Sequence, residues 1–397
     1  MLTLPVAIKR PILGCILVIL CICTIASSTC PTPLSLQLSN CTIAGTTVDS
    51  WGLMLDLANP SQYVCLSPST VTNSTLVLGS AFCQTGSNIT TPQCESLCGN
   101  TFDTSAAGTS YTSSSPSVVL APNPLWSLLS SAPLLAGTTE LQLPPTSELS
   151  KYPIGIITSG NNQNVGHFGL ANDSDFLRTA LSNGLIPANG FGLDVGSQSV
   201  SNPRNGAIIA GGYDLARVNG AFTNFSITGT DISERNCPLE LIITELVLRF
   251  PTTEGFTDVN LTSSGVIIPA CLEPYDNLFR FPSSILQPFE DATGWSTDTA
   301  ANVDPNLYIA EPGLYYPQMK GFNGSLIFTL NNGFVVEIPN EELANPLRGI
   351  DRNGARVLQP NITEVSIFFQ AGRLNTAVLG KAFLSQVSYF YTFVYIR

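Results

Sequence analysis

The sequence predicts an all-β fold, and three observations favour it. Hydrophobic residues make up 44% of the 397-residue chain and charged residues only 11%, which is too apolar a composition for a disordered protein. Gly, Pro, Ser, Thr and Asn fill much of the remainder, which makes the chain too rich in turn formers for a helical protein. Short apolar runs recur between these turn formers, a pattern typical of many short strands. The length suits two lobes of ordinary size or one large β domain.

A secretory signal peptide is predicted over residues 1–28. Lys9 and Arg10 precede the apolar run Pro11–Ala26, and the small residues Ser27 and Ser28 follow it. The run is about 16 residues long, shorter than the roughly 20 that span a bilayer as a helix. An uncleaved signal anchor remains the alternative. We therefore expect a secreted protein with no stable membrane span after signal removal.

Charge and histidine content exclude several classes of function. A formal net charge of −12 argues against nucleic acid and anionic membrane surfaces as partners. His167 is the only histidine, so neither the usual histidine-based zinc site nor a Ser-His-Asp triad is expected. We expect no metal and no cofactor.

The cysteines indicate disulfide bonds. Three of the eleven lie in the apolar run and would leave with it, whereas eight follow: Cys30, Cys41, Cys65, Cys83, Cys94, Cys98, Cys237 and Cys271. An even set in an exported chain predicts up to four disulfides, whose connectivity stays open. We favour a Cys237–Cys271 bond because no other cysteine lies in the C-terminal half. The Cys94-x-x-x-Cys98 spacing could belong to a metal site, but no second pair completes it, and disulfide bonding is the better interpretation.

Eight Asn-x-Ser/Thr sequons predict glycosylation of an exported chain. They begin at Asn40, Asn73, Asn88, Asn172, Asn224, Asn260, Asn323 and Asn361.

The first part of the mature chain predicts strands and loops. Residues 31–49 are turn-rich with one apolar stretch, which predicts a first edge strand. Trp51–Leu57 alternates and predicts a strand that Asn59-Pro60 ends, and the next strand begins at Tyr63. Residues 83–100 are predicted to be a cysteine-bearing loop, and the Ser-rich residues 112–117 a solvated flexible loop.

The remainder predicts one helix and further strands. Residues 175–181 carry apolar side chains at helical spacing, which predicts a short amphipathic helix closed by Gly184. Strands are predicted at 241–250, 314–317, 324–330 and 335–339.

Trp51–Gln62 resembles the first hairpin of the pepsin family of aspartic peptidases, in which a Gly-Thr-Pro-x-Gln turn ends an alternating strand. In that family the catalytic Asp-Thr-Gly lies seven residues after the Gln, and Trp-Val follows five residues after the triplet. The same count here reaches Ser69-Thr70-Val71 and then Leu76-Val77. The frame of the catalytic loop is kept, but serine stands in place of the aspartate.

Further segments resemble the family in the same order. Phe102–Tyr111 resembles the segment before the flap, Asn164–Leu170 resembles Asp-Gly-Ile-x-Gly-Leu, and Gly206–Asp214 resembles the strand that ends in Gly-Gly-x-Asp. Phe281–Ile285 resembles the Pro-x-x-Ile helix start, and nine residues before Pro282 lies Glu273, at the place of the second aspartate. Val378–Leu384 resembles the closing Ile-Leu-Gly-x-x-Phe-Leu.

The resemblance spans roughly residues 51–390. It implies a bilobed, pepsin-like double β-barrel with a central cleft and a few short helices. The lobes would comprise residues 29–227 and 228–397.

The expected chemistry departs from the family. Pepsin-type catalysis needs two carboxylates that share one proton, and Ser69 does not ionise near neutral pH. Glu273 keeps a carboxylate but adds a methylene that displaces it. In the cleft loops Thr70 is kept, but Val71 replaces a glycine, and Pro274 and Tyr275 replace the second Thr-Gly. Asp56, Asp214 and Asp276 are rival carboxylates with expected structural roles.

Three functions remain open. The first is a secreted, monomeric glycoprotein that lacks peptidase activity and binds a peptide or protein in the cleft. The second is an active aspartic endopeptidase that works at acid pH with a degenerate pair. The third is a structural protein, or one similar to pepsin-fold inhibitors of glycosidases. Ser69 and Glu273 favour the first.

Overall fold

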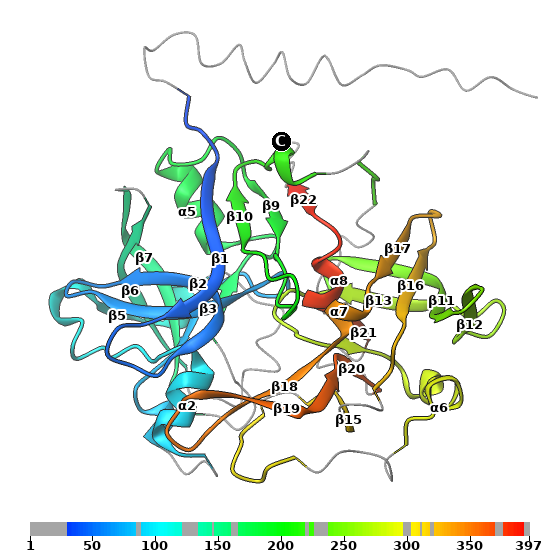
Figure 1. The fold of residues 1–397 in the computed structure, drawn as a ribbon. Coiled ribbons are helices and arrows are strands. Elements are labelled where there is room, and N and C mark those ends of the chain that lie inside the picture. Colours follow the sequence, from blue (N-terminus) through cyan, green and yellow to red (C-terminus); the bar gives the residue numbers. More distant parts are fainter. Residues whose placement is uncertain are drawn as a thin grey trace, which may run out of the picture.

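The chain is built mostly from β-strands, with a few short helices (Figure 1). The computed structural model describes residues 30–84, 89–120, 134–144, 147–159, 166–218, 222–225, 237–296, 303–309, 312–317, 321–369 and 376–392. The predicted signal peptide lies outside the described residues. No described helix has the length and apolar character that crossing a bilayer requires.

Eleven strands form the first sheet, in the order β22-β9-β10-β1-β2-β3-β8-β4-β7-β6-β5. In chain order they are β1 (Leu34–Thr42), β2 (Asp49–Leu57), β3 (Gln62–Ser69), β4 (Leu76–Leu78), β5 (Thr112–Ser114), β6 (Leu134–Leu143), β7 (Ser147–Ile157), β8 (Gly166–Gly169), β9 (Gly190–Asp194), β10 (Gly206–Ala210) and β22 (Tyr389–Thr392). Strand β2 also pairs with β6, so the six strands β2-β3-β8-β4-β7-β6 close into a barrel.

A second sheet holds eight strands of the C-terminal half, with the path β17-β16-β11-β13-β21-β14-β20 and β12 paired to β11. They are β11 (Glu240–Thr252), β12 (Gly255–Asn260), β13 (Ile268–Leu272), β14 (Phe279–Arg280), β16 (Ser325–Leu330), β17 (Val335–Ile338), β20 (Ile367–Phe368) and β21 (Ala377–Leu379). A third sheet has the order β15-β19-β18, from β15 (Leu314–Pro317), β18 (Ala344–Ile350) and β19 (Arg356–Val365).

The helices are short and lie between strands. The α-helices are α2 (Thr91–Cys98), α3 (Pro116–Val119), α5 (Asp175–Ser182), α6 (Leu286–Thr293), α7 (Asn340–Leu343) and α8 (Lys381–Leu384). The 3₁₀ helices are η2 (Phe82–Gln84), η3 (Gly108–Ser110), η4 (Leu215–Arg217) and η5 (Ser283–Ile285).

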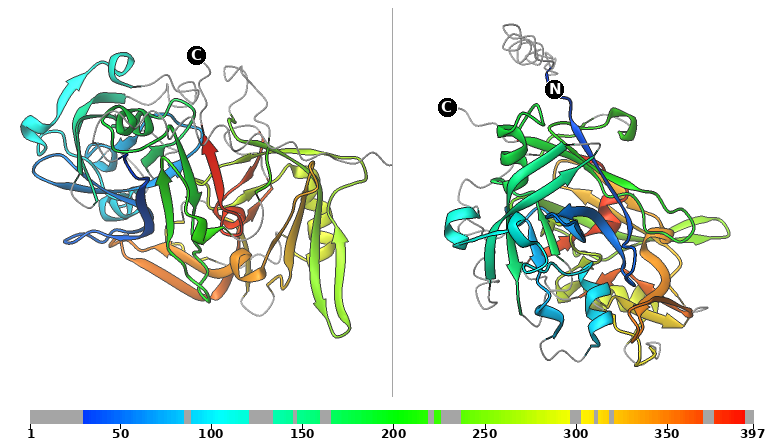
Figure 2. Two further views of the ribbon diagram at one scale, coloured as in Figure 1. Left: turned by 90° about the horizontal axis from the view of Figure 1, so that it is seen from above. Right: turned by 90° about the vertical axis from the view of Figure 1, so that its left-hand side faces the viewer.

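The two halves of the chain meet in the middle of the molecule. Figure 1 shows the barrel strands on one side, β11, β12, β16 and β17 on the other, and β9, β10 and β22 between them. Strand β22 pairs antiparallel with β9, so the end of the described chain joins the sheet of the N-terminal half. The β11–β12 hairpin extends away from the rest of the second sheet (Figure 2).

Aromatic side chains fill the core of the C-terminal half. The ring of Phe328 lies 5.2 Å from that of Phe279 and 5.3 Å from that of Phe383 between ring centroids. All three side chains are buried, and such contacts add to the free energy gained from removing apolar surface from water. They join β14, β16 and α8 in one packed unit.

Three disulfides have both cysteines among the described residues: Cys41–Cys65, Cys83–Cys94 and Cys237–Cys271. The last is the pair that the sequence favoured. Cys30 is disulfide-bonded as well, whereas Cys98 keeps a free, buried thiol. The prediction of a disulfide bond for Cys98 is therefore wrong, because Cys94 is bonded to Cys83 instead.

Most predicted strands are confirmed, as is the helix at 175–181, which is α5. The expected edge position of the first strand is wrong, because β1 lies between β10 and β2. The loop predicted at 83–100 is also wrong, because α2 forms there. Thr90 and Gln93 make a reciprocal capping box at its start, and Gly99 adopts a left-handed conformation at its end. The loop predicted at 112–117 is replaced by β5 and the start of α3.

The predicted glycosylation sites differ in exposure. The exposed asparagines are Asn40, Asn224, Asn260, Asn323 and Asn361. Asn172 is half-buried, and Asn88 lies outside the described residues. Asn73 is only 7% exposed and its side-chain oxygen accepts from the Asp173 N–H at 3.0 Å, which leaves no room for a glycan. A glycan on Asn73 would require this side chain to leave its buried position.

Candidate functional site

Ser69 and Glu273 face each other at the junction of the two halves. The Ser69 Oγ lies 3.4 Å from Glu273 Oε2, although 204 residues separate the two. Ser69 ends β3, and Glu273 directly follows β13. Both side chains are buried, at 0% and 5% exposure. The two positions that the sequence singled out therefore meet in space.

The same local arrangement positions each of the two residues. Strand β3 pairs in parallel with β8, which ends at Gly169, and β13 pairs in parallel with β21, which ends just before Gly380. A Cβ on Gly169 would lie 2.6 Å from the Ser74 oxygen, and one on Gly380 would lie 2.5 Å from the Asp276 oxygen. Gly169 thus lets the end of β8 pass directly beneath the loop after β3, which starts from Ser69 and is called the first loop. Gly380 lets the end of β21 pass beneath the loop after β13, which starts at Glu273 and is called the second loop. This repeated arrangement relates the halves to each other.

Thr70 ties the two loops together. Its hydroxyl donates to the main-chain oxygen of Leu272 at 2.6 Å and lies 3.3 Å from Glu273 Oε2. The Thr70 side chain is buried, so this hydrogen bond forms away from water. It fixes the separation between the first loop and the end of β13.

Burial controls the protonation of Glu273. Loss of solvation raises the pKa of the Glu273 carboxyl to about 8, and the nearby Asp276 carboxyl acts in the same direction. The Tyr275 N–H, which donates to Oε1 at 2.9 Å, and the hydroxyls of Ser69 and Thr70 oppose the rise without cancelling it. At neutral and acidic pH Glu273 is therefore mainly a neutral carboxylic acid that can donate a hydrogen bond to a hydroxyl oxygen beside it.

The residues flanking the pair are more enclosed than the sequence predicted. Thr70, Val71 and Pro274 were expected to line an open cleft, but all three are buried. Tyr275 is half-buried and stacks on His167, with ring centroids 4.0 Å apart and an interplanar angle of 11°. His167 comes from β8 and Tyr275 from the second loop, so this contact also joins the halves.

The rival carboxylates serve other roles. Asp56 accepts from the Ser61 hydroxyl, and Asp214 accepts from the Ala216 N–H at the start of η4. Asp276 forms an ion pair with Arg280 and accepts from the Leu278 N–H at 3.0 Å. None of these acids has a hydrogen bond to Ser69 in the described part of the chain.

A cavity of about 210 Å³ lies against the same two loops. Its lining includes Ser67, which precedes Ser69 by two residues, and Tyr275, which follows Glu273 by two. Neither Ser69 nor Glu273 is among the described residues that line it. The other lining residues come from β2, α2, α7, β18, β19 and α8, and from loops that include Val195, Asn277 and Tyr308. We call it the central cavity.

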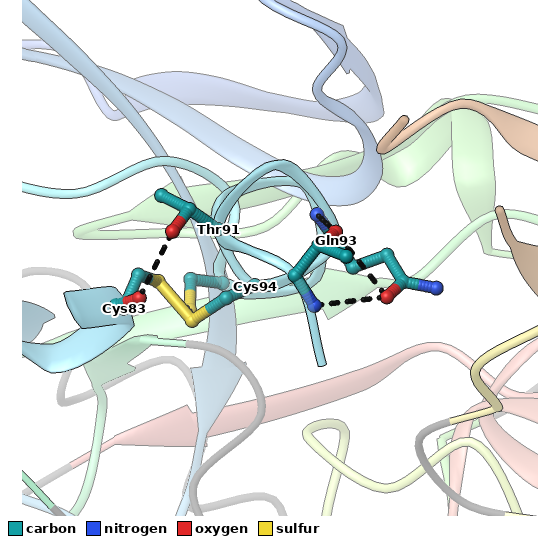
Figure 3. The surroundings of a disulfide bond; sticks show 6 residues. Cys83, Thr91, Gln93 and Cys94 are labelled. Atoms are coloured by element: carbon teal, nitrogen blue, oxygen red, sulfur yellow. Dashed lines mark hydrogen bonds between the residues drawn. A yellow bond between two sulfur atoms is a disulfide. The ribbon is translucent and has the colours of Figure 1, made fainter. Parts of the chain in front are cut away.

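Three sulfur atoms gather near the start and end of α2. The Cys98 Sγ lies 3.7 Å from both Cys83 Sγ and Cys94 Sγ. Figure 3 shows the Cys83–Cys94 bond, beside which the Thr91 hydroxyl donates to the Cys83 carbonyl oxygen. Because the bond uses two of the sulfurs, only one thiol remains, and a three-thiolate metal site would require reduction of the disulfide.

No family model matches this chain, and no curated protein matches its sequence.

Sequence reasoning missed several parts of this region. The Leu272 carbonyl is a main-chain group, which leaves no trace in residue identity. The stacking of His167 on Tyr275 depends on register between distant segments. Lys381 lies inside the Gly-x-x-Phe segment noted above, and a lysine in so apolar a stretch was a usable sign of a buried charge.

Proposed function

We propose that this chain is a secreted, monomeric, pepsin-like glycoprotein with two β lobes and no peptidase activity, which binds a peptide or protein between its halves. The observation that carries the proposal is the 3.4 Å contact between the Ser69 hydroxyl and the Glu273 carboxyl. In the family that the sequence resembles, two aspartates occupy these places. Disulfide bonding and the exposed sequons support export.

The lobed architecture is supported by the repeated arrangement of the two loops. In each half, a strand that leads into the loop pairs in parallel with a strand whose last residue, or the residue directly after it, is a glycine. The glycine then passes beneath the loop at a distance that no Cβ would allow. Two copies of one arrangement, facing each other, are what a two-lobed pepsin-like fold requires.

The lack of catalysis follows from the chemistry of the pair. An aspartic peptidase needs one ionised carboxylate to activate water and one protonated acid to assist the leaving group. At acid pH Glu273 is protonated and Ser69 is a neutral alcohol, so no base is present. Raising the pH above 8 ionises Glu273 but leaves no acid partner. Losing one acid–base partner typically costs about 10²–10⁴-fold in rate.

Binding between the halves is supported by the central cavity, which residues of both halves line. Trp51, Tyr275 and Tyr308 supply aromatic surface there, a composition common in ligand sites.

The proposal is tested by incubating the mature protein with an unfolded protein substrate from about pH 3 to pH 7. We expect no cleavage by the wild type. The Ser69→Asp, Glu273→Asp double variant serves as the counterpart, and a gain of acid proteolysis would indicate a decayed catalytic site. Cleavage by the wild type that a transition-state inhibitor of aspartic peptidases blocks would refute inactivity and establish the endopeptidase instead.

A further inference from the structure

The hairpin of β18 and β19 directs two arginines into the central cavity. Arg348 lies opposite Leu358, and Ile350 lies opposite Arg356. Since side chains alternate along a strand, Arg348 and Ile350 share a face, and so does Arg356, the cross-strand partner of Ile350. Both arginines line the cavity. One face of this hairpin therefore forms a cationic wall.

A lysine reaches the cavity from a different element. Lys381 begins α8, is only 8% exposed, and donates through Nζ to Asn277 Oδ1 at 2.9 Å. Its Nζ also lies 3.5 Å from the Ser67 hydroxyl. Three cations thus enter the cavity from two parts of the C-terminal half.

Arg348 and Lys381 both donate hydrogen bonds to neutral oxygens. Arg348 donates to the main-chain oxygen of Gln198 at 2.8 Å. The Nε of Arg356 is buried and has no hydrogen-bond partner, and Asp49 Oδ2 lies 4.0 Å from it. A buried guanidinium nitrogen without an acceptor is costly and is expected to bind an oxygen when one is supplied.

The acids around the cavity offset this positive charge only in part. Glu342 and Glu364 line it, and burial raises the pKa of both carboxyls, that of Glu364 to about 7. Glu342 has Arg204 near it, and Asp49 lies beside both arginines. Arg348 lies near both Glu364 and Asp49, so these carboxyls offset part of the charge of the two arginines.

We propose that the central cavity binds a carboxylate of a ligand through Arg348, Arg356 and Lys381. A guanidinium presents parallel N–H donors that match the two oxygens of a carboxylate, and Arg356 Nε is one such donor without an acceptor. A volume of about 210 Å³ suits a small organic acid or one side chain of a bound peptide. The aromatic walls from Trp51, Tyr275 and Tyr308 would cover the apolar part of either. Only the peptide source rests on the proposed function above.

The test measures binding to the folded, mature protein by calorimetry, at low salt because screening weakens charge interactions. One arm uses glutarate, a small dicarboxylate. The other uses an end-blocked alanine peptide with a central glutamate, and its matched partner with glutamine instead. Binding of glutarate alone identifies a small acid as the ligand, and binding of the glutamate peptide alone identifies a peptide side chain.

The variants are Arg348→Gln on the hairpin and Lys381→Gln on α8, with circular dichroism to verify folding. Because they lie on different elements, one remains informative if the other fails to fold. We expect each variant to raise the dissociation constant about ten- to a hundredfold, which is the usual effect of losing a hydrogen bond to a charged group. Arg352→Gln is the matched control, since Arg352 is exposed on the same hairpin, and should change it less than about threefold.

The proposal is overturned if neither probe binds, if sulfate competes as well as glutarate, or if Arg352→Gln weakens binding as much as Arg348→Gln. It is also overturned if the glutamine peptide binds as tightly as the glutamate peptide. In that case peptide binding between the halves would stand, and only the carboxylate site would fail.

Discussion

The Thr70 hydroxyl donates to the main-chain oxygen of Leu272 at 2.6 Å, across 202 residues of sequence. Thr70→Val keeps the shape of the side chain but leaves that buried carbonyl without this donor. We expect the free energy of unfolding to fall by about 1–3 kcal/mol. Urea unfolding of the purified variant measures it.

Thr72 provides the matched control two residues away. Its hydroxyl is fully buried and has no hydrogen-bond partner in the described structure. Thr72→Val therefore removes an unsatisfied polar group and should leave stability unchanged or raise it. Equal destabilisation by both changes would show that the contact to Leu272 contributes nothing.

The raised pKa of Glu273 predicts that the free energy of unfolding falls as the pH rises. The unfolded chain ionises this carboxyl near its ordinary pKa of 4.5, whereas the folded protein holds the proton until about pH 8. The contribution of Glu273 to the free energy of unfolding is thus fully present below about pH 4.5. It is lost between there and about pH 8, at no more than about 1.4 kcal/mol per pH unit. Glu273→Gln, which stays neutral, should flatten the stability profile there.

Glu342 and Glu364 shift in the same direction, so the comparison is between profiles of variant and wild type. The exposed Glu254 supplies the control, and Glu254→Gln should leave the profile unchanged. A Glu273→Gln profile parallel to that of the wild type would show that Glu273 is ionised in the folded protein at neutral pH.

The two glycines beneath the loops should not tolerate a side chain. Gly169→Ala places a Cβ 2.6 Å from the Ser74 oxygen, and Gly380→Ala places one 2.5 Å from two main-chain oxygens. Since backbone must move in both cases, we expect a destabilisation of about 3 kcal/mol or more, measured by thermal unfolding. Gly321→Ala, where the nearest atom lies 3.5 Å away, should change stability by less than about 1 kcal/mol. Similar melting temperatures for all three variants would contradict the close approach.

Cys98 should form the disulfide bond to Cys83 when Cys94 is replaced. Its sulfur lies 3.7 Å from Cys83 Sγ, so the Cys94→Ser variant is expected to form a Cys83–Cys98 disulfide during folding. Peptide mapping under non-reducing conditions identifies the bond. Cys98→Ser is the control and should keep Cys83 joined to Cys94. In the folded wild type, burial raises the pKa of the Cys98 thiol, so exchange and alkylation should both be slow. Two free thiols in Cys94→Ser would show that the sulfurs are not within bonding reach.

Much of the β architecture could be predicted from local patterns. The alternation from Trp51 to Leu57 gave β2, and apolar spacing after Ser174 gave α5. Helix α2 was missed because its closely spaced cysteines were interpreted as part of a disulfide-bonded loop. Thr90 and Gln93 nevertheless form a capping-box pattern, which indicates the start of a helix. The central position of β1 depends on pairing with β10, some 170 residues later, which no local pattern reveals.

The candidate site also has one part that the sequence could predict and one part that it could not. Counting along the chain was enough to select Ser69 and Glu273. The central cavity was not predictable, because its charged side chains come from the β18–β19 hairpin and from the two short helices α7 and α8. Only the fold brings Arg348, Arg356 and Lys381 to one space.

The pairing of β22 with β9 has a consequence for biogenesis. Tyr389 is placed opposite Leu193, so β9 leaves the ribosome nearly 200 residues before its neighbour exists. At about 5–20 residues per second, that wait lasts roughly ten to forty seconds. Until then the first sheet presents a bare edge to other nascent chains, and a chaperone that shields it would protect the protein from aggregation during synthesis.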